Sequence, residues 1–523
     1  VSDPIDQAGI DILTQVAQVD QKVGLSIDQL KNIICDYDGL MIRSGTQVTS
    51  DVISEAKKLR IIGRAGVGVD NVDVPSATKK GVLVVNSPGG NTIAAAEHAL
   101  AMILSLSRNI PQAHASMFSG GWDRKKYVGN ELYKKTLGVV GLGKIGSHVA
   151  KVANAMGMEV IGFDPFVSTE RAQQMQVRLS DIEELFKQSD YVTLHLPRTP
   201  ETENLVDIDL LRKMKPTSRL VNCARGGIIN ENDLANALEE NVIQGAAIDV
   251  YAKEPLAENS PLRAVKKGLV LTPHLGASTV EAQQNVAIDV AEQIRDVLLG
   301  LPARSAVNIP GLSAEIMDSL KPHLKLAETL GLLVSQISGG QIQKLEVRLQ
   351  GEFAQHPSQP LVIATLKGLL TSALGDKINY VNASLEAKGR GIDVVEIQDE
   401  LSPEFARGSL QLDSFSDKGR HSVSGTVFGD GDLGITSIDE YPINFVPSRH
   451  MLFTRHRDMP GIIGQIGSLL GKHNVNIASM QVGRRIVRGE AVMVLSIDDP
   501  IPSELLGSIL TMQGINEAHS VTL

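Results

Sequence analysis

The sequence predicts a chain of several domains, the first part of which has an α/β fold built on parallel sheets. From about residue 25 to residue 300, short β-branched runs alternate with helical stretches, an alternation typical of βαβ units. The length of 523 residues leaves room for roughly three or four domains. The alternation stops at a stretch rich in Gly and Pro, which predicts a domain boundary. Its punctuating residues are Gly300, Pro302, Pro310 and Gly311.

Nine segments of the α/β region have the composition of buried strands, which is more than one ordinary sheet holds. They are Leu40–Ile42, Ile61–Gly63, Val82–Val85, Leu137–Val140, Val160–Phe163, Val192–Leu194, Leu220–Asn222, Ala246–Ile248 and Val270–Thr272. The apolar, Ala-rich segment Thr92–Ser107 is expected to be a buried helix that joins two α/β units.

Helix ends are predicted from capping residues. Ser180 and Glu183 have the spacing of a capping box. Asn230 can cap a helix that runs to about Glu240. A long helix is expected over Thr279–Leu299, directly before the boundary.

Two further domains are predicted beyond the boundary. Residues 314–448 indicate a mixed α+β domain, because the helix Ala314–Ile337 is followed by short alternating runs such as Ile342–Leu349 and Val423–Phe428. Residues 450–523 follow a β-α-β-β-α-β order, which is typical of a ferredoxin-like split βαβ domain. Its segments are His450–Arg455, Gly461–Lys472, Val475–Val482, Ala491–Ile497, Pro502–Met512 and Ile515–Leu523.

Composition excludes several classes of protein. With 50 Lys and Arg against 60 Asp and Glu, the net charge of −10 argues against nucleic acid as a partner. No apolar stretch reaches the roughly 18 residues that span a bilayer, so no membrane partner is expected. Cys35 and Cys223 are too few for a disulfide framework or a zinc site, so we expect no metal and a reducing compartment. No targeting segment precedes the fold, which favours a cytoplasmic location, with an organellar stroma left open.

A glycine-rich motif indicates a dinucleotide site. Gly141, Gly143 and Gly146 form a G-x-G-x-x-G between a predicted strand and a predicted helix. The glycines let the backbone approach a pyrophosphate, which the free N–H groups of the helix N-terminus can bind. Asp164 follows the next strand, where its carboxylate can accept a hydrogen bond from an adenosine ribose and would repel a 2′-phosphate. The predicted cofactor is therefore NAD.

Other polar residues follow the predicted strands. Ligands of open parallel sheets bind beyond the carboxyl ends of the strands, so we expect these residues to surround one crevice. They are Arg43, Arg64, Asn86, Asp164, His195, Arg225, Asp249 and His274.

Three residues suit hydride transfer between a nicotinamide and an alcohol. That reaction needs an acid/base for the hydroxyl proton and a cation for the neighbouring carboxylate. His274 is the acid/base candidate, and Glu254 can orient it and raise its pKa. Arg225 offers a bidentate fork to a carboxylate. Each residue alone could be structural, and only their joint order along the chain favours catalysis.

The motifs around these residues resemble those of the D-isomer-specific 2-hydroxyacid dehydrogenase family. The matching runs are Gly141–Gly146, Asp164, Asn222–Gly227, Asp249–Pro255 and Pro273–Ser278. Gly63–Val72, Asn86–Pro88 and the domain order resemble the long members of the family, which carry an intervening domain and a C-terminal ACT domain. The resemblance covers essentially the whole chain.

The resemblance implies the catalytic roles given above and further contacts with NAD. Along the cofactor it places Lys144, Ile145, Pro197, Cys223, Ala224 and Asp249. Lys144 stands where the family often has Arg, a departure of little weight because backbone N–H groups do most of the pyrophosphate binding. Cys223 is interpreted as a small packing residue rather than a reactive thiol.

For the long members, the resemblance implies oxidation of 3-phosphoglycerate to 3-phosphohydroxypyruvate, the first step of L-serine biosynthesis. A substrate with a carboxylate and a phosphate needs a concentrated set of cations in a chain of net charge −10. The residues expected to hold it are Arg43, Arg64, Asn86 and Arg225. Arg124, Lys125 and Lys126 follow Trp122 in a stretch that in the family reaches a neighbouring subunit, and a solvated basic face is the alternative.

In the C-terminal domain, the resemblance implies an allosteric site for L-serine formed by His456, Asp458 and Asn476. Asp458 would pair with the ammonium of the ligand, and Asn476 would bridge to it. The alternative is a ferredoxin-like dimerisation module without a ligand.

The expected organisation is a flavodoxin-like substrate-binding domain (residues 1–91 and 287–313) that contains an inserted Rossmann NAD-binding domain (92–286). An intervening allosteric domain (314–448) and an ACT regulatory domain (450–523) follow. Family analogy favours a homotetramer, or at least a homodimer. Two other functions stay open: an NAD-dependent reductase of another 2-oxo acid, such as hydroxypyruvate, or an NAD-sensing, corepressor-like binding protein.

Overall fold

The N-terminal sheet has three parallel strands. The computed structural model describes residues 1–301, 303–309, 314–399, 408–429 and 431–523, so Pro302, Pro310 and Gly311 of the expected boundary lie outside it. The strands β1 (Gly39–Ile42), β2 (Ile61–Arg64) and β3 (Leu83–Asn86) pair in that order. The helices around them are α1 (Gln7–Thr14), α2 (Ile27–Ile33), α3 (Ser50–Glu55), α4 (Val74–Lys80) and the long α13 (Val280–Leu298).

A second, seven-stranded parallel sheet follows in the order β10-β9-β8-β7-β4-β5-β6. Its strands are β4 (Thr136–Val140), β5 (Glu159–Phe163), β6 (Arg178–Leu179), β7 (Tyr191–Leu194), β8 (Arg219–Asn222), β9 (Gly245–Ile248) and β10 (Leu269–Leu271). Its helices are α5 (Thr92–Arg108), α6 (Ile110–Phe118), α7 (Lys144–Ala155), α8 (Thr169–Gln174), α9 (Ile182–Gln188), α10 (Ile208–Lys213), α11 (Glu231–Glu239) and α12 (Pro261–Ala264). The strand order reverses between β4 and β7, which is where doubly wound sheets bind their ligands.

Most local predictions for the α/β region are confirmed. All nine expected strands are present, and the strand missed is the two-residue β6. Asn230 caps α11 by accepting hydrogen bonds from the N–H groups of Asn232 and Asp233. The capping box at Ser180 is wrong, because α9 is capped by Asp181, whose side chain accepts from the N–H of Glu184.

Two α+β units complete the chain. The six-stranded sheet, in the order β12-β11-β13-β14-β15-β16, carries the packed helices α14 and α15, and the four-stranded sheet has the order β18-β19-β17-β20. The first unit, which we call the α14 unit, has α14 (Ala314–Ile337), β11 (Ile342–Gln350), α15 (Ser358–Leu374), α16 (Ala383–Gly389), β12 (Asp393–Asp399), β13 (Ser409–Ser416), β14 (Gly419–Val427), β15 (Leu433–Ile438) and β16 (Tyr441–Phe445). The second has β17 (His450–Arg457), α17 (Ile462–Lys472), β18 (Ile477–Arg484), β19 (Glu490–Ile497), α18 (Ser503–Leu510) and β20 (Ile515–Thr522).

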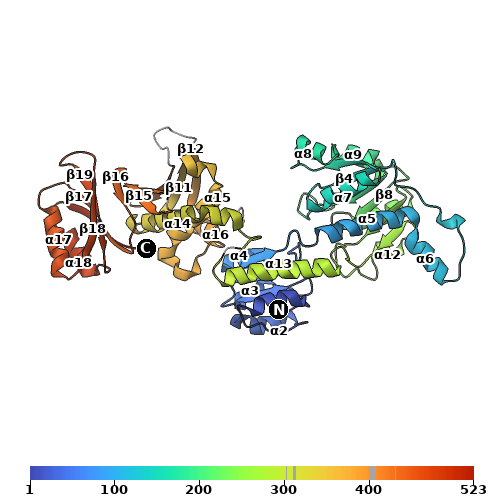
Figure 1. The fold of residues 1–523 in the computed structure, drawn as a ribbon, viewed down its shortest axis with the longest axis horizontal. Coiled ribbons are helices and arrows are strands. Elements are labelled where there is room, and N and C mark those ends of the chain that lie inside the picture. Colours follow the sequence, from blue (N-terminus) through green and yellow to red (C-terminus); the bar gives the residue numbers. More distant parts are fainter. Residues whose placement is uncertain (302, 310–313, 400–407, 430) are drawn as a thin grey trace.

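The four units are arranged along the long axis of the molecule (Figure 1). Helix α13 lies on the N-terminal sheet, where Val290 and Ile294 join its core, and it extends toward the seven-stranded sheet. Helices α17 and α18 cover one face of the four-stranded sheet. Residues of its other face, such as Met451 and Phe453, belong to the core of the α14 unit. No helix among the residues just described is long and apolar enough to cross a membrane.

Candidate active site

A cavity of about 850 Å³ lies between the N-terminal sheet and the seven-stranded sheet. Arg43 and Arg64 line it from the carboxyl ends of β1 and β2, and His274 lines it from the loop after β10. Helix α13 contributes Ala282 and Val286 to its wall. Predicted residues that follow strands of two different sheets therefore lie together in one cleft.

His274 and Glu254 form a hydrogen-bonded pair in this cleft. His274 Nδ1 lies 2.7 Å from Glu254 Oε2, and Glu254 Oε1 accepts from the Tyr251 N–H at 3.0 Å. The hydrogen bond to Glu254 raises the pKa of His274, against the opposing effect of burial. Burial alone would raise the pKa of Glu254, but its bonds with His274 and Tyr251 lower it overall. With its carboxylate ionised, Glu254 holds the Nδ1–H of His274 and leaves Nε2 free to exchange a proton.

Asp249 fixes the loop that carries His274. This carboxylate is fully buried, and it accepts from Thr272 Oγ1 at 2.5 Å and from the N–H groups of Leu275 and Gly276 at 2.7 and 2.9 Å. His98 Nε2 on α5 lies 3.2 Å from it. Burial would raise the pKa of Asp249, but these donors lower it, so the group stays ionised. Sequence reasoning did not find His98, because a lone His within an apolar helix carries no motif.

Three arginines lie close to one another near His274. Burial, together with the neighbouring charges of Arg225 and Arg43, lowers the pKa of Arg64 to about 10. Among the residues that the structure describes, the buried Arg64 Nε has no hydrogen-bond partner. Its guanidinium also lies against Gly66, where a Cβ would be 1.7 Å from Nη1, so a larger residue there would displace the guanidinium. A buried guanidinium with an open donor and cationic neighbours is suited to binding an anion.

The arginines are positioned by residues that sequence reasoning missed. Asp3 accepts from the Arg43 N–H at 2.6 Å, and Asn71 Nδ2 donates to the Arg43 carbonyl at 2.7 Å. Asp70 Oδ2 lies 3.6 Å from Arg225 Nε. These three residues lie in loops far from any recognised catalytic motif, although Asp70 and Asn71 fall inside the run that carried the family resemblance.

The glycine-rich turn fits a pyrophosphate. A Cβ at Gly146 would lie 1.9 Å from the Gly141 carbonyl oxygen, and one at Gly141 would lie 2.5 Å from the His195 carbonyl oxygen. A Cβ at Gly143, by contrast, would meet nothing within 4 Å, so this turn faces open space. Helix α7 begins at Lys144 and Ile145 without any side-chain cap, which leaves its first N–H groups for a ligand.

The other predicted cofactor residues border this turn. Asp164 accepts from the Leu142 N–H at 2.8 Å and from the Phe166 N–H at 2.9 Å, so it ties the turn to the end of β5. Pro197 follows β7, and Cys223 and Ala224 follow β8. Burial raises the pKa of the Cys223 thiol, which agrees with a packing residue.

Two residues of the strand-end group turn away from the cleft. Asn86 donates through Nδ2 to the Val67 carbonyl at 2.5 Å and does not line the cavity. His195 Nε2 lies 3.0 Å from Thr193 Oγ1, and burial lowers the pKa of this imidazole to about 4. Of the eight residues expected to surround one crevice, only Arg43, Arg64 and His274 line this cavity. Asn86 and His195 bond instead to Val67 and Thr193, because a side chain after a strand can also turn back toward the sheet.

The three residues expected to bind serine do not meet within one chain. Asp458 follows β17 at the end of the sheet where Arg457 pairs with Glu490, whereas Asn476 precedes β18 at the opposite end. Asp458 pairs with Arg484 Nη1 at 2.6 Å. His456 is buried, and this burial lowers its pKa.

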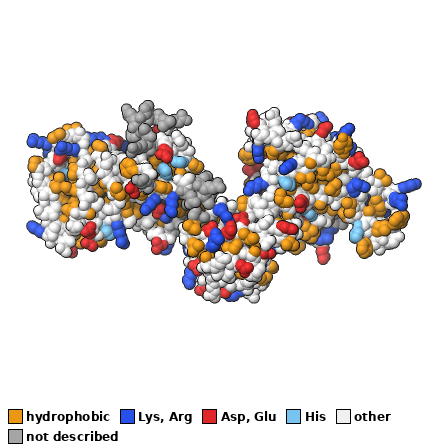
Figure 2. Space-filling view, viewed as in Figure 1, with side chains coloured by type: hydrophobic (Ala, Val, Ile, Leu, Met, Phe, Trp, Pro, Cys, Tyr) orange, Lys and Arg blue, Asp and Glu red, His pale blue; other side chains and the backbone are white. Residues whose placement is uncertain are grey.

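The arm formed by α6 and the residues that follow it carries the basic residues Arg124, Lys125 and Lys126. Apolar side chains are exposed along this arm, including Phe118, Trp122 and Val128. Arg124 lies 5.8 Å from the centre of the Trp122 ring. The arm projects from one end of the molecule, where hydrophobic and basic side chains share the surface (Figures 1 and 2).

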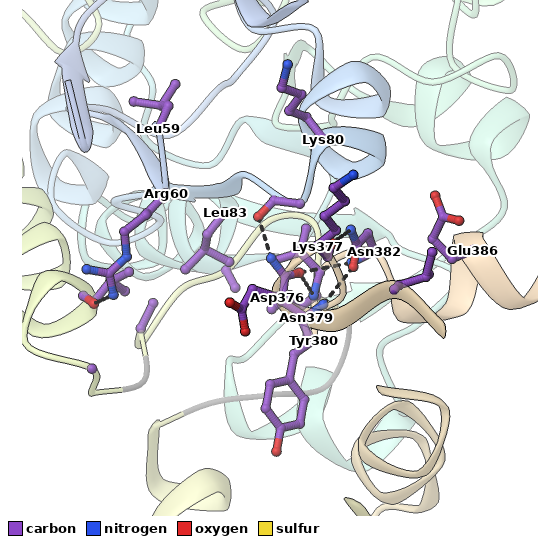
Figure 3. Close-up of a pocket in the computed structure, with 18 of the residues that line it drawn as sticks. Leu59, Arg60, Lys80, Leu83, Asp376, Lys377, Asn379, Tyr380, Asn382 and Glu386 are labelled. Carbon is purple, nitrogen blue, oxygen red and sulfur yellow. Dashed lines mark hydrogen bonds between the residues drawn. The ribbon is translucent and has the colours of Figure 1, made fainter. Parts of the chain in front are cut away.

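A second cavity of about 1150 Å³ lies where the N-terminal sheet meets the α14 unit (Figure 3). Asn379 Nδ2 donates to the Gly81 carbonyl across this junction at 2.9 Å. The cavity has an excess of cations, since Glu328, Asp376 and Glu386 are its acidic residues. Its basic residues are Lys57, Lys58, Arg60, Lys79, Lys80, Lys321, Lys325 and Lys377.

Comparisons with known proteins agree with this architecture. Residues 100–276 match the NAD-binding domain of D-isomer specific 2-hydroxyacid dehydrogenases, residues 319–439 the D-3-phosphoglycerate dehydrogenase intervening domain, and residues 450–510 the ACT domain. A D-3-phosphoglycerate dehydrogenase of Synechocystis sp. is 60% identical over 100% of this chain and 94% of its own. One of Methanocaldococcus jannaschii is 44% identical over 100% and 99%. The solved structure of the TT0316 protein from Thermus thermophilus matches 59% of this chain and 98% of its own, with a TM-score of 0.55 and 31% identity.

Proposed function

The chain belongs to the D-3-phosphoglycerate dehydrogenase family, and from that premise we propose how its cleft performs the reaction. It is an NAD-dependent oxidoreductase that converts 3-phosphoglycerate to 3-phosphohydroxypyruvate, a step of serine synthesis. The observation that carries the assignment of residues is the buried, unpartnered Arg64 Nε beside His274. A dianionic phosphate and a carboxylate would supply the negative charge that this cluster lacks.

In the proposed mechanism, His274 is the general base for the substrate hydroxyl. Glu254 holds Nδ1, so Nε2 of the neutral ring accepts the hydroxyl proton while the carbon gives up its hydride. NAD, when bound, supplies the acceptor for that hydride. Arg225 holds the substrate carboxylate, and Arg43 and Arg64 bind its phosphate. In the reverse direction, protonated His274 returns the proton to the carbonyl oxygen.

The turn Gly141–Gly146 would hold the pyrophosphate of NAD, and Asp164 its adenosine ribose. Both Asp164 oxygens already accept a backbone N–H, but each retains a second lone pair for a ribose hydroxyl. Asp249 would position the nicotinamide side of the site through the 272–276 loop. Pro197, Cys223 and Ala224 would line the cofactor from the ends of β7 and β8. We propose no role for Asn86 beyond positioning the Val67 backbone.

Regulation and assembly form the second part of the proposal. The edge strand β18 is mostly exposed, and its antiparallel pairing with a second copy would bring Asn476 of one chain toward Asp458 of the other. Such a dimer would assemble the serine site that one chain alone does not form. The apolar arm around Trp122 would supply a second two-fold contact, and the two contacts together would give a tetramer. Both cysteines are free thiols, which supports a reducing compartment such as the cytoplasm.

The test measures NADH oxidation with 3-phosphohydroxypyruvate and with hydroxypyruvate, each with and without L-serine. We expect kcat/KM to be roughly 10- to 100-fold higher for the phosphorylated substrate, because a hydrogen bond to a charged group contributes about 1.5–3 kcal/mol. His274→Ala should lower kcat by about 1000-fold with NADH affinity unchanged. Equal kcat/KM for both substrates would favour the reductase of unphosphorylated 2-oxo acids. Absence of turnover with either would favour the corepressor-like protein.

A further inference from the structure

Two histidines and a glutamate converge in the α14 unit, well away from the cleft. His323 lies on α14, and Glu352 and His356 lie within and directly after the short helix η3 (Gly351–Gln355). One imidazole nitrogen of each histidine and one carboxylate oxygen of Glu352 all lie within 4.8 Å of one another. These groups come from two separate segments, so the fold, and not local sequence, brings them together.

The two imidazoles present unused nitrogen atoms. His323 is only 9% exposed, and its buried Nδ1 has no hydrogen-bond partner in the described part of the chain. The Nε2 of His356 is also buried and unpartnered. A buried polar nitrogen without a partner is rare, because it loses its hydration and gains nothing in return. Each ring of this cluster therefore has a nitrogen that a ligand could satisfy.

Aromatic neighbours pack against the His323 ring. The His323 ring contacts the Phe353 and His356 rings, with centroid separations of 4.7 and 5.0 Å. Burial and the neighbouring His356 lower the pKa of His323. Glu352 is exposed, which gives the group an opening to solvent and a negative charge.

We propose that His323, Glu352 and His356 bind a divalent transition metal of the zinc class. Two imidazole nitrogens and one carboxylate oxygen form a ligand set that zinc accepts, and water would fill the remaining position. The three ligand atoms, which lie within 4.8 Å of one another, would move closer together around a bound ion. The bound metal would join α14 to the turn between β11 and α15. Sequence reasoning expected no metal because it considered only the cysteines and local spacing.

The experiment uses the full chain, freed of metal by dialysis against a chelator and then titrated with Zn²⁺ and, separately, Co²⁺. Wild type should bind zinc, unfold at a higher temperature when loaded, and show the visible absorption of Co²⁺ bound in a tetrahedral site. His356→Asn and Glu352→Gln should weaken binding by at least about tenfold, since even changes outside the ligand set have that effect. His473→Asn is the matched control, because His473 is exposed and its Nδ1 bonds only the Leu469 carbonyl.

A second cluster must be separated from this one. His98, Cys223 and Asp249 also lie within 4.8 Å of one another, in the cofactor part of the chain. The same titration on Cys223→Ala should retain the zinc that His356→Asn loses. His323→Ala is avoided because its ring packs in the core. The proposal is overturned if wild type binds no zinc, or if His356→Asn and Glu352→Gln bind it as tightly as wild type does.

Discussion

The two cavities that border the N-terminal sheet hold positive charge in different ways. The cleft is lined by Arg43, Arg64 and Arg263, with Arg225 close to Arg64, and hydrogen bonds from several segments fix the loops of Arg43 and Arg225. In the cavity at the α14 unit, seven of the eight basic residues are lysines, and all seven are exposed. Among the described residues, none of these seven lysines has a carboxylate within 4.0 Å.

This difference shows what a specific anion site requires beyond charge. Arg64 is partly buried against Gly66, and among the described residues its Nε has no hydrogen-bond partner. An exposed lysine is a mobile point charge that loses side-chain entropy when a ligand orders it. The cleft therefore offers an anion fixed geometry. The cavity between the N-terminal sheet and the α14 unit, which we call the junction cavity, offers a diffuse positive field that salt screens.

Arg64 and Arg60 provide the sharpest test, because they stand at the two ends of β2 and face different cavities. Arg64→Lys keeps the charge but loses the fork, so KM for 3-phosphohydroxypyruvate should rise about 10- to 100-fold with kcat little changed. Arg60 donates to the Val297 and Leu298 carbonyls at the end of α13. Arg60→Lys should lower the unfolding temperature slightly and leave KM within about twofold. Similar KM changes in both variants would contradict a distinction between the two cavities.

The pH dependence of kcat/KM tests the pairing of His274 with Glu254 in the cleft. The bond to Glu254 is the largest cause of the raised pKa of His274, so Glu254→Gln should lower that pKa. In the oxidative direction the neutral imidazole is the base, and the acidic limb of kcat/KM should therefore move to lower pH. The maximal rate should fall by about tenfold, since the amide orients the ring less firmly. A limb that stays in place would show that His274 does not titrate in this step.

Local signals in the sequence were sufficient for most of the fold. Hydrophobic patterns located nine of the ten strands in the two parallel sheets. The capping side chain of Asn230 correctly predicted the start of α11. The periodicity failed for β6, which is too short to show a pattern. At α9, Ser180 and Asp181 are both good capping residues, and only the backbone geometry selects Asp181.

The candidate site was predictable only where each residue follows its own strand. That rule found Arg43, Arg64 and His274, since the carboxyl ends of parallel strands meet at one edge. It could not find His98, which reaches Asp249 from a helix far earlier in the chain. The same limit applies to His323 and His356, whose proximity depends on how α14 packs. Contacts between distant segments have no period or spacing that the sequence displays.

The lysines of the junction cavity should produce the smallest effect. Lys79, Lys321 and Lys325 are exposed, so replacing each with Ala should change KM in the cleft by less than about twofold at physiological salt, where screening acts over about 8 Å. The free energy of unfolding should change by about 0.5 kcal/mol or less, because no described carboxylate is left without a partner. Lowering the salt should enlarge any change in KM, since a diffuse field acts over a longer range in weak electrolyte. A salt-independent, tenfold change in KM would instead mean that the junction cavity is linked to the cleft through the N-terminal sheet, and the two cavities would then have to be treated as one regulated system.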